Sequence, residues 1–279
     1  MRAFHENRMY GLNLPVQIGT AHNISFLAHW HNDVELAFVL DGSIRMGINS
    51  ESRVLEKGDL AVCASGDIHY YDSREHESTI LLVIFNPQLI GCPGGWPKDV
   101  RLTSPFLAGY EAGDSSMTQE NFGQITAILN ALLPEVEQKP AYYEMLLTGK
   151  LFELSGLILR HSRCEPANHR KDKRRLIRMN ILQNVLDYLD ANFMNDVTLE
   201  DAANHANMSL FHFSRYFKEM SGMNFTLYLN NLRVNHAEAL ILSTNKTMID
   251  IALECGFTNV RTFNRVFKQV RNRTPSELR

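Results

Sequence analysis

Short apolar runs separated by turn signals dominate roughly the first ninety positions of the chain. The runs are rich in strand-forming residues and occupy positions 35–40, 53–55, 59–62 and 78–85. Turns between them are marked by Gly42, Gly58 and Gly66, each of which stands next to an aspartate. Many short strands at this spacing predict an antiparallel β-barrel or sandwich.

The apolar spacing changes after residue 87. Residues 87–116 contain a loop rich in proline and glycine and show no clear period, so we expect a long connection that leaves the barrel. Between residues 119 and 160 apolar residues recur at spacings of three and four, which predicts two amphipathic helices. Pro134 is expected to break the first helix, and Pro140 precedes the second. These helices would cover the barrel or pair with another subunit, and the spacing leaves both open.

A polar stretch at residues 162–175 separates this region from the C-terminal part of the chain. It is interrupted by Pro166 and ends in a run of charged residues, so we interpret it as a linker. A helix is expected from about residue 178 to residue 192. Its inward-facing residues would be Ile181, Val185, Leu186 and Leu189.

One pattern occurs twice between residues 196 and 273. Each copy opens on a threonine followed three positions later by an aspartate, at Thr198 and Asp201 and again at Thr247 and Asp250. A Thr or Ser followed at this distance by an acid is the signature of a capped helix start. Ordered repetition of this kind indicates two copies of one supersecondary unit.

A turn residue follows the first short helix of each copy. Asn207 and Gly256 are the two residue types that best tolerate a left-handed backbone. Ser209 is expected to cap the next helix in the first copy, and Thr258 or Asn259 in the second. Each copy therefore has the sequence pattern of a helix-turn-helix.

The second helix of each copy has one apolar face. Phenylalanines four residues apart form that face, at positions 213 and 217 and again at 263 and 267. The other faces carry Phe211, Ser214 and Arg215 in the first copy, and Arg261 and Arg265 in the second. Such a helix buries one side and offers the other to a DNA major groove. A plain helical bundle with solvated arginines is the alternative.

Composition and charge agree with a two-domain globular protein. The 279 residues are 44% hydrophobic and 21% charged, and no window approaches the roughly 18 apolar residues of a membrane span. The four cysteines are far apart and are expected to be reduced, in a cytoplasmic protein. Residues 1–169 hold 12 Lys+Arg and 20 Asp+Glu, whereas residues 170–279 hold 16 and 11. The half with the repeat is therefore positive, which suits a phosphate backbone.

A longer motif makes the repeat specific. It comprises RVNHAEALIL at 233–242, IALECGF at 251–257, FK at 267–268 and TPS at 274–276. Together these resemble the DNA-binding domain of the AraC/XylS family of transcription regulators, over roughly the last hundred residues. The resemblance implies a double-stranded DNA partner, a small-molecule effector, a homodimer, and RNA polymerase as a partner if the protein is an activator. It implies base contacts from Phe211, Ser214, Arg215, Arg261 and Arg265.

Two positions depart from the family pattern near the end of the second copy. The family has an aromatic residue and a glycine before Thr-Pro, where this chain has Arg271 and Asn272. Asn272 is expected to serve as a left-handed cap. Arg271 places a charge where an apolar contact is expected, and the helix that follows should be short.

Candidate chemistry lies in the predicted barrel. The segment His29-Trp-His31-Asn-Asp-Val-Glu35, with Gly42 and later His69, resembles the cupin motifs. His29, His31 and Glu35 share the parity of one strand face, and His69 would come from a neighbouring strand. Three histidines and a carboxylate suit Fe, Mn, Ni or Zn. The four residues would bind such a metal, line an effector pocket, or satisfy one another in the barrel mouth.

The fold expected from these features is α+β. A cupin-like antiparallel barrel (residues 1–116) would precede a helical dimerisation or packing segment (117–161), the linker (162–175) and a C-terminal bundle with two helix-turn-helix motifs (176–279). The cupin segment taken with RVNHA at 233–237 resembles sugar regulators of the melibiose-operon type, which implies a carbohydrate effector. We expect a ligand-responsive, DNA-binding transcription regulator without enzymatic activity. The alternative is a metal-dependent cupin enzyme with an accessory helical domain.

Overall fold

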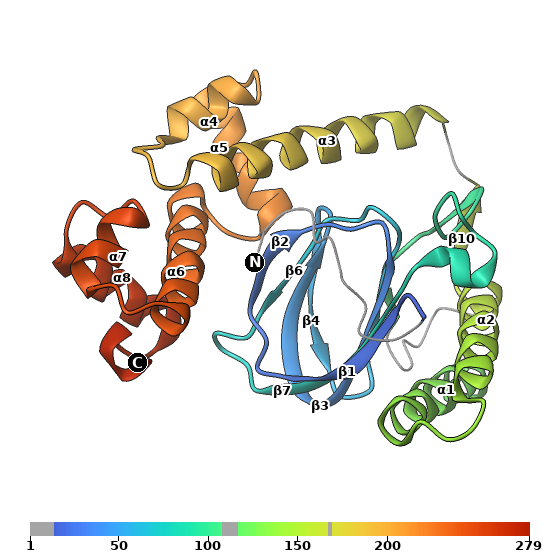
Figure 1. Cartoon of the computed structure of the whole chain (residues 1–279). Coiled ribbons are helices and arrows are strands. Elements are labelled where there is room, and N and C mark those ends of the chain that lie inside the picture. The colour runs from blue at the N-terminus through green and yellow to red at the C-terminus, as the bar shows by residue number, and fades with distance from the viewer. Residues whose placement is uncertain (1–13, 108–116, 167–168) are drawn as a thin grey trace. The chain divides into compact units, whose positions relative to one another are not determined.

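A computed structural model describes residues 14–107, 117–166 and 169–279 of the chain. The structure is α+β, as predicted, with an antiparallel sheet in the N-terminal part and helices in the C-terminal part (Figure 1). Apart from residues 27–29, which group with the C-terminal unit, the described residues divide into two compact units between residues 175 and 176, and each unit is described by itself. Strand β2 (Phe26–His29) is described with the sheet in which it pairs.

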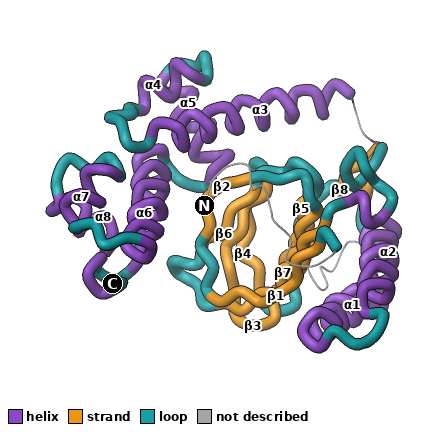
Figure 2. Tube along the Cα trace, in the orientation of Figure 1, coloured by secondary structure: helices purple, strands orange, loops and turns teal. Residues whose placement is uncertain are grey.

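Within the described residues, one sheet of eight strands curls around a common interior (Figure 2). Its strands are β1 (Val16–His22), β2, β3 (Val34–Ile48), β4 (Glu51–Glu56), β5 (Leu60–Cys63), β6 (His69–Asp72), β7 (Ser78–Phe85) and β9 (Phe106–Leu107). The main path runs β1-β7-β3-β5-β9, while β4 pairs with β3, and β6 pairs with both β2 and β3. The first half of β3 pairs with β5 and β7, and its second half pairs with β4 and β6. The long strand β3 therefore joins both parts of the sheet.

Two helices belong to the same unit, α1 (Gln119–Gln138) and α2 (Tyr143–His161). The prediction that Pro134 breaks the first helix is wrong, because α1 continues through it. Leu129 and Leu132 are fully buried in the turns just before the proline. Their packing outweighs the local cost of about 3 kcal/mol that an internal proline imposes.

Alternate residues of β3 face opposite sides of the sheet. Leu36 and Phe38 belong to an apolar cluster that includes the buried residues of α1 and α2. Ala37 and Val39 belong to a second cluster, which fills the barrel interior with residues of β4, β6 and β9. Glu35 has the parity of this second set, so the fold places a carboxylate on the interior side.

Residues 87–107 hold more regular structure than the expected connection. They contain the short 3-10 helix η1 (Pro87–Ile90) and the strands β8 (Val100–Leu102) and β9. Because β9 pairs with β5, the chain returns to the sheet after leaving it. Strands of two or three residues are too short to show a period, which is why the sequence did not reveal them. The remainder of the expected connection, 108–116, lies outside the described residues.

The polar stretch at 162–175 likewise contains regular structure. Strand β10 (Cys164–Pro166) pairs with β8, and helix α3 (His169–Asn192) begins well before the predicted residue 178. Lysine and arginine are good helix formers, so a charge run is compatible with a helix as well as with a linker. The division of the chain into four segments stays a prediction.

The inward face of α3 follows the prediction with one exchange. Val185, Leu186 and Leu189 are fully buried, as expected. Ile181 is half-buried, and Leu182 takes the fully buried position instead. The predicted inward face was therefore wrong by one residue at its first position.

The C-terminal unit continues with two short-helix and long-helix pairs joined by one long helix. Its elements are α4 (Leu199–His205), α5 (Leu210–Ser221), α6 (Phe225–Ser243), α7 (Met248–Glu254), α8 (Val260–Arg271) and the 3-10 helix η2 (Pro275–Glu277). The helices α4 and α5 form the first predicted helix-turn-helix, and α7 and α8 form the second. The last helix is short, as predicted.

The start signals of the repeat are confirmed at α4 and α7. The Thr198 hydroxyl accepts a hydrogen bond from the backbone N–H of Asp201, and the Asp201 carboxylate accepts one from the backbone N–H of Thr198. Hydrogen bonds that the Thr198 hydroxyl and the Thr198 backbone N–H donate to the Asp201 carboxylate hold the pKa of Asp201 below its ordinary value. The Thr247 hydroxyl accepts from the backbone N–H of Asp250 in the same way.

The turn residues are confirmed, and one cap is not. Asn207 and Gly256 have φ of 52° and 78°, in the left-handed region, and Asn272 caps α8 with φ of 55°. Asn259 caps α8 by accepting from the N–H of Thr262 at 2.8 Å. Ser209 stands at the N-cap of α5, but its side chain makes no capping hydrogen bond there.

Candidate functional site

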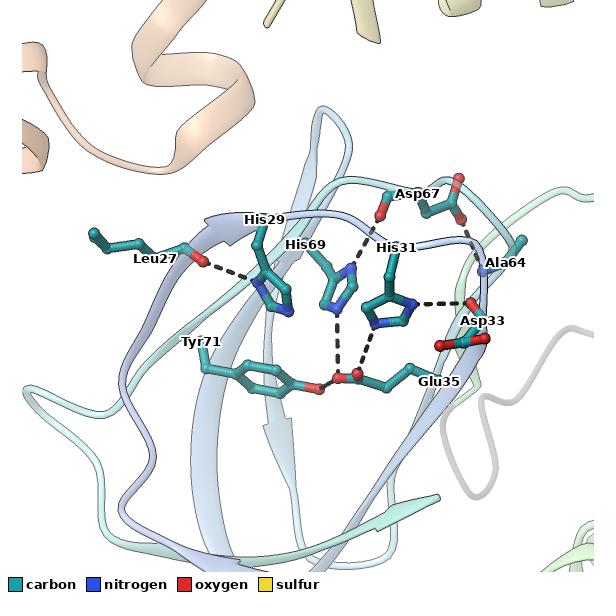
Figure 3. Close-up of polar contacts among 9 residues, drawn as sticks. All are labelled: Leu27, His29, His31, Asp33, Glu35, Ala64, Asp67, His69 and Tyr71. Carbon is teal, nitrogen blue, oxygen red and sulfur yellow. Dashed lines mark hydrogen bonds and ion pairs between the residues drawn. The ribbon is translucent and has the colours of Figure 1, made fainter. Parts of the chain in front are cut away.

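Four side chains from separate elements converge in the barrel interior (Figure 3). His29 ends β2, His31 lies in the loop after it, Glu35 lies near the start of β3, and His69 begins β6. One potential ligand atom from each residue lies within 4.8 Å of the others, and all four residues are buried. The sequence predicted this set, but it placed His29, His31 and Glu35 on one strand. A loop between β2 and β3 separates them, and β6 brings His69 across.

The three imidazoles are held in the same way. Nδ1 of each ring lies within hydrogen-bond distance of a backbone carbonyl two residues away, which can only accept, so Nδ1 carries the proton. The three Nδ1–O distances are 2.9 Å from His29 to Leu27, 3.1 Å from His31 to Asp33 and 3.0 Å from His69 to Asp67. In a neutral ring Nε2 therefore carries the lone pair that could bind a ligand, and Figure 3 shows the His31 and His69 rings above Glu35 and the His29 ring above Tyr71. Orienting hydrogen bonds of this kind accompany metal-ligating histidines.

Glu35 is the centre of the hydrogen-bonded set. One carboxylate oxygen lies 3.1 Å from Nε2 of His31, and the other lies 3.4 Å from Nε2 of His69. The Tyr71 hydroxyl donates to the second oxygen at 2.5 Å. Burial alone would raise the pKa of Glu35, but the charge on His69 and the hydrogen bonds from His31 and His69 outweigh it. The pKa of Glu35 is held well below its ordinary value, so the carboxylate is ionised.

His69 and Cys63 also face each other. Burial lowers the pKa of His69, yet Cys63 and Glu35 outweigh burial and raise that pKa well above its ordinary value. Burial raises the pKa of the Cys63 thiol to about 11, so the thiol keeps its proton near neutral pH. The ionised Glu35 is therefore the group that favours the imidazolium form of His69.

These residues fit a divalent first-row metal ion. Three imidazole nitrogens and one ionised carboxylate match the donor preference of Fe, Mn, Ni and Zn, and the orienting bonds point the donors at a common point. Metal binding would require His69 to lose the proton that Glu35 favours. The same atoms can instead hydrogen-bond a polar molecule, which is the second use that the sequence left open.

The predicted DNA-reading residues lie on exposed faces of α5 and α8. Phe213, Phe217, Phe263 and Phe267 are fully buried, as the repeat predicted. Phe211 is 80% exposed, and the other four predicted residues are exposed with it, namely Ser214, Arg215, Arg261 and Arg265. Each second helix therefore buries its phenylalanines and keeps the polar face in solvent. Arg265 donates a hydrogen bond to Gln269 at 3.2 Å, a contact that stays on the exposed face.

Comparison with known proteins covers both halves of the chain. A helix-turn-helix domain model matches residues 202–279, and a cupin domain model matches residues 20–85. The HTH-type transcriptional activator RhaR of Yersinia pseudotuberculosis is 26% identical over 281 residues, covering 98% of this chain and 92% of that protein. The chain belongs to the AraC family of transcription regulators.

Two solved structures match the C-terminal part of this AraC-family chain. The C-terminal domain of AraT, a response regulator from Geobacillus stearothermophilus, is 30% identical, covering 36% of this chain and 83% of that one, with a TM-score of 0.35. A transcriptional regulator with an AraC-type DNA-binding domain from Chromobacterium violaceum is 29% identical, covering 36% and 89%, with a TM-score of 0.35.

As an AraC-family regulator, the protein binds DNA through its helix-turn-helix domain and responds to a ligand. The relatives that it matches over most of its length are transcription regulators and not enzymes. None of the helices in the described residues has the length and apolar character needed to cross a membrane.

Sequence reasoning did not connect Tyr71 with Glu35, and it gave no separate role to the lysines of the two second helices. Tyr71 orients Glu35, and its place two residues after His69, on the same strand face, was a usable signal. Lys218 and Lys268 are exposed at equivalent positions of α5 and α8, and the repeat itself marks them. The carbonyls of Leu27, Asp33 and Asp67 left no signal, because any residue type supplies a backbone carbonyl.

Proposed function

We propose that this regulator is a transcription activator in which the barrel binds a small metabolite of the carbohydrate class and the helix-turn-helix pair carries the response to DNA. The observation that carries the proposal is the convergence of His29, His31, Glu35 and His69 in the same chain as the repeated DNA-binding unit. The proposal that the protein activates transcription and does not repress it is supported by the relatives named as transcriptional activators. Activation implies RNA polymerase as a partner.

The buried cluster is the proposed point of metabolite contact. A metal ion there would be held by the three Nε2 atoms and the Glu35 carboxylate, and would supply a Lewis acid for a hydroxyl or carbonyl oxygen. Tyr71 and the backbone carbonyls would keep the ligands in place, since such second contacts fix ligand orientation. Hydroxyl-rich molecules suit this chemistry because each hydroxyl both donates and accepts.

Two exposed helix faces are the proposed reading surfaces on DNA. Arg261 and Arg265 on α8, and Arg215 on α5, have the planar donors that match guanine O6 and N7. Phe211, which is exposed on α5, would contact a thymine methyl. Ser214 would hydrogen-bond to a base edge. Lys218 and Lys268 would contact phosphates. The two helices would occupy major-groove faces about one turn, roughly 34 Å, apart.

A second copy of the chain is the proposed partner of α2. Its outward face carries Tyr142, Met145, Leu146 and Phe152, which are 79%, 74%, 53% and 51% exposed. Gly149 and Gly156 lie on the same face, where an added Cβ would meet nothing within 4 Å. Large apolar side chains alternating with glycines at heptad spacing suit the close approach of another helix. The opposite face of α2 is already buried in the apolar cluster of its own unit.

The proposal is tested by selecting a DNA site for the full-length chain from a random pool and titrating metabolites. A panel of sugars and sugar derivatives is screened first by thermal shift, with and without added Mn, Fe, Ni or Zn, because a ligand of the folded state raises its apparent stability. The expected result is a metabolite that stabilises the protein and changes its affinity for the selected DNA. Metabolite binding that leaves DNA affinity unchanged contradicts the proposal.

A metal-dependent enzyme is the second candidate function. The same buried donor set favours it, because three histidines and a carboxylate also support catalysis in cupin-like sites. Turnover of a stabilising metabolite by the metal-loaded chain, lost in His31→Ala while DNA binding persists, would support it. The absence of turnover at saturating metabolite, with DNA binding responding to it, supports the regulator alone.

A further inference from the structure

We propose that α5 reads the C5-methyl group of a pyrimidine through Phe211, so that thymine and 5-methylcytosine are interchangeable at one position of the DNA site. The inference rests on the proposed function, which places Phe211 at a thymine, and goes beyond it by naming the chemical group that is read. The helix α8 has an arginine at the equivalent position and reads hydrogen-bonding groups instead. Binding to the α5 half of the site therefore responds to cytosine methylation, and binding to the α8 half does not.

Phe211 and Arg261 occupy equivalent positions of the two helix-turn-helix units. Each is the second residue of a helix of 12 residues, α5 or α8. Two residues later, each helix buries a phenylalanine completely, at Phe213 and Phe263. The buried faces are in register, so the side chains of Phe211 and Arg261 leave their helices in the same direction. Both lie at the N-terminal end of the helix, the end that contacts base edges in a helix-turn-helix.

Phe211 differs from every other phenylalanine of the C-terminal unit. Its side chain is 80% exposed, and Leu210 beside it is 50% exposed. The other phenylalanines within residues 176–279 are all 8% exposed or less, at positions 193, 213, 217, 225, 257, 263 and 267. The core of this unit therefore takes its aromatic rings from elsewhere. The ring of Phe211 is presented at the end of the helix that enters the groove.

The charges around Phe211 suit DNA. Arg215 and Lys218 lie one and two turns further along α5, and both are exposed. Glu219 is the one acidic residue of α5, and its carboxylate accepts a hydrogen bond from Arg178 of α3 at 2.8 Å, which offsets its charge. An apolar ring flanked by basic side chains matches the major groove, where phosphates line the edges and pyrimidine methyl groups project from the base pairs.

A phenyl ring distinguishes bases by shape and apolar contact, because it has no hydrogen-bond donor or acceptor. In the major groove thymine presents an O4 acceptor and a C5-methyl group, whereas cytosine presents an N4 donor. Methylation at C5 gives cytosine the same methyl group and leaves its N4 donor in place. Ser214 is compatible with both bases, because a hydroxyl donates and accepts. Arg261 donates to guanine O6 and N7, which C5 methylation of the paired cytosine does not alter.

The test uses the full-length chain and begins with selection of its DNA site from a random pool. Parallel selections with Phe211→Ala and Arg261→Ala identify the position that each side chain reads, because the preference there relaxes. Duplexes are then synthesised with thymine, uracil, cytosine or 5-methylcytosine at the Phe211 position, each opposite its complementary purine. Fluorescence anisotropy measures the affinity for each duplex.

Two matched controls accompany these duplexes. In the DNA, cytosine is exchanged for 5-methylcytosine opposite the guanine that Arg261 reads. In the protein, Leu242→Ala removes an apolar side chain that is 66% exposed on α6, in the same unit but outside both recognition helices.

The expected result is a methyl effect at the Phe211 position alone. Exchanging thymine for uracil should weaken binding about fourfold, and methylating cytosine should strengthen it about fourfold, the size expected for burying one methyl group. Phe211→Ala should remove both differences, and Leu242→Ala should keep them. Phe211→Arg, which copies the residue of α8, should move the preference at this position to guanine.

Three results overturn the inference. They are equal affinity within the thymine–uracil or the cytosine–5-methylcytosine pair, a methyl effect that survives in Phe211→Ala, and a Phe211→Ala variant that selects the same site as the wild type. A selected site whose binding responds to a metabolite but shows no methyl effect overturns the methyl contact and leaves the proposed function standing. Failure of the full-length chain to select any site overturns the proposed function, and the methyl contact with it.

Discussion

Nε of Arg271 donates a hydrogen bond to the Glu238 carboxylate at 2.8 Å, which joins the end of α8 to α6. The same guanidinium donates to the Asn235 side chain at 2.6 Å, and Arg273 donates to the other Glu238 oxygen at 3.1 Å. The family pattern has an aromatic residue at position 271, and an ionic contact replaces its apolar packing here. Because the Arg271 and Glu238 side chains are 23% and 22% exposed, the pair is partly shielded from solvent.

Glu238→Gln should therefore loosen the end of α8. Removing the charge weakens the contacts of Glu238 with both Arg271 and Arg273, so we expect a loss of about 1 kcal/mol in local stability. Amide hydrogen exchange of the α8 and α6 peptides in the full-length chain measures the change. Glu254→Gln is the control, because it breaks the more exposed Lys246–Glu254 pair in the same unit. Equal protection in Glu238→Gln and the wild type would show that the network contributes nothing.

Gly256, in the turn of the second helix-turn-helix, packs closely against the backbone that follows α3. Its φ is 78°, and an added Cβ would lie 2.5 Å from the Phe193 carbonyl oxygen. Gly256→Ala should cost about 2 kcal/mol or more, since backbone strain and a clash with backbone atoms add. At Gly58, φ is 93° and an added Cβ would meet nothing within 4 Å, so Gly58→Ala should cost about 1 kcal/mol. Thermal unfolding of both variants measures the two losses of stability. Equal losses would show that the clash at Gly256 contributes nothing.

Tyr71→Phe should weaken metal binding without removing a metal ligand. The Tyr71 hydroxyl orients Glu35, and losing such a contact typically costs 10- to 100-fold in metal affinity. Tyr70→Phe is the control, because Tyr70 has the opposite parity on β6 and its ring packs against Gly47. Competition with a chromophoric chelator measures both affinities for Zn and Mn. Equal affinity of the two variants would mean that Tyr71 does not tune the site.

Arg261→Ala should change which DNA sequences are bound. If Arg261 reads a base, the variant loses about 1–3 kcal/mol on the selected site and relaxes its preference at one position. Lys268→Ala should instead weaken all sequences alike and reduce the salt dependence of binding. Selection from a random pool followed by anisotropy titrations at two salt concentrations measures both. If Arg261→Ala weakens binding to all DNA sequences equally, Arg261 contacts a phosphate and not a base.

Leu146→Glu should convert a dimer into a monomer. It places a charge at the centre of the exposed apolar face of α2, where a second copy is proposed to pack. Asn130→Glu adds the same charge to an exposed position of α1 and should leave the assembly unchanged. Sedimentation equilibrium of the full-length proteins measures the mass. A wild type that is monomeric at micromolar concentration would contradict the α2 interface.

The sequence predicted most of what depends on local pattern. Capped starts at Thr198 and Thr247, left-handed turns at Asn207 and Gly256, and the histidine cluster all follow from residue type at a fixed spacing. These features are encoded within a few residues of each other or by strand parity. They were therefore visible without the fold.

What depends on tertiary packing was not visible. The effect of Pro134 was misread because the buried leucines of α1 pack against α2 and against barrel strands that are distant in the sequence. That packing holds the helix together. Strand β9 was missed because its two residues acquire their role only by pairing with β5. Strand parity could have pointed to Tyr71, but its contact with Glu35 depends on how β6 pairs with β3. The sequence also left open how Arg271 is satisfied, since its partner lies on a different helix.

The most direct test of the account is whether occupancy of the barrel controls DNA binding. Fluorescence anisotropy measures the affinity of the full-length chain for its selected DNA with and without saturating metabolite. The account predicts a change of about 5- to 150-fold, the usual size of coupling between two sites, in the wild type and none in Glu35→Gln. An unchanged DNA affinity in the wild type, at a metabolite concentration that saturates the barrel, would contradict it.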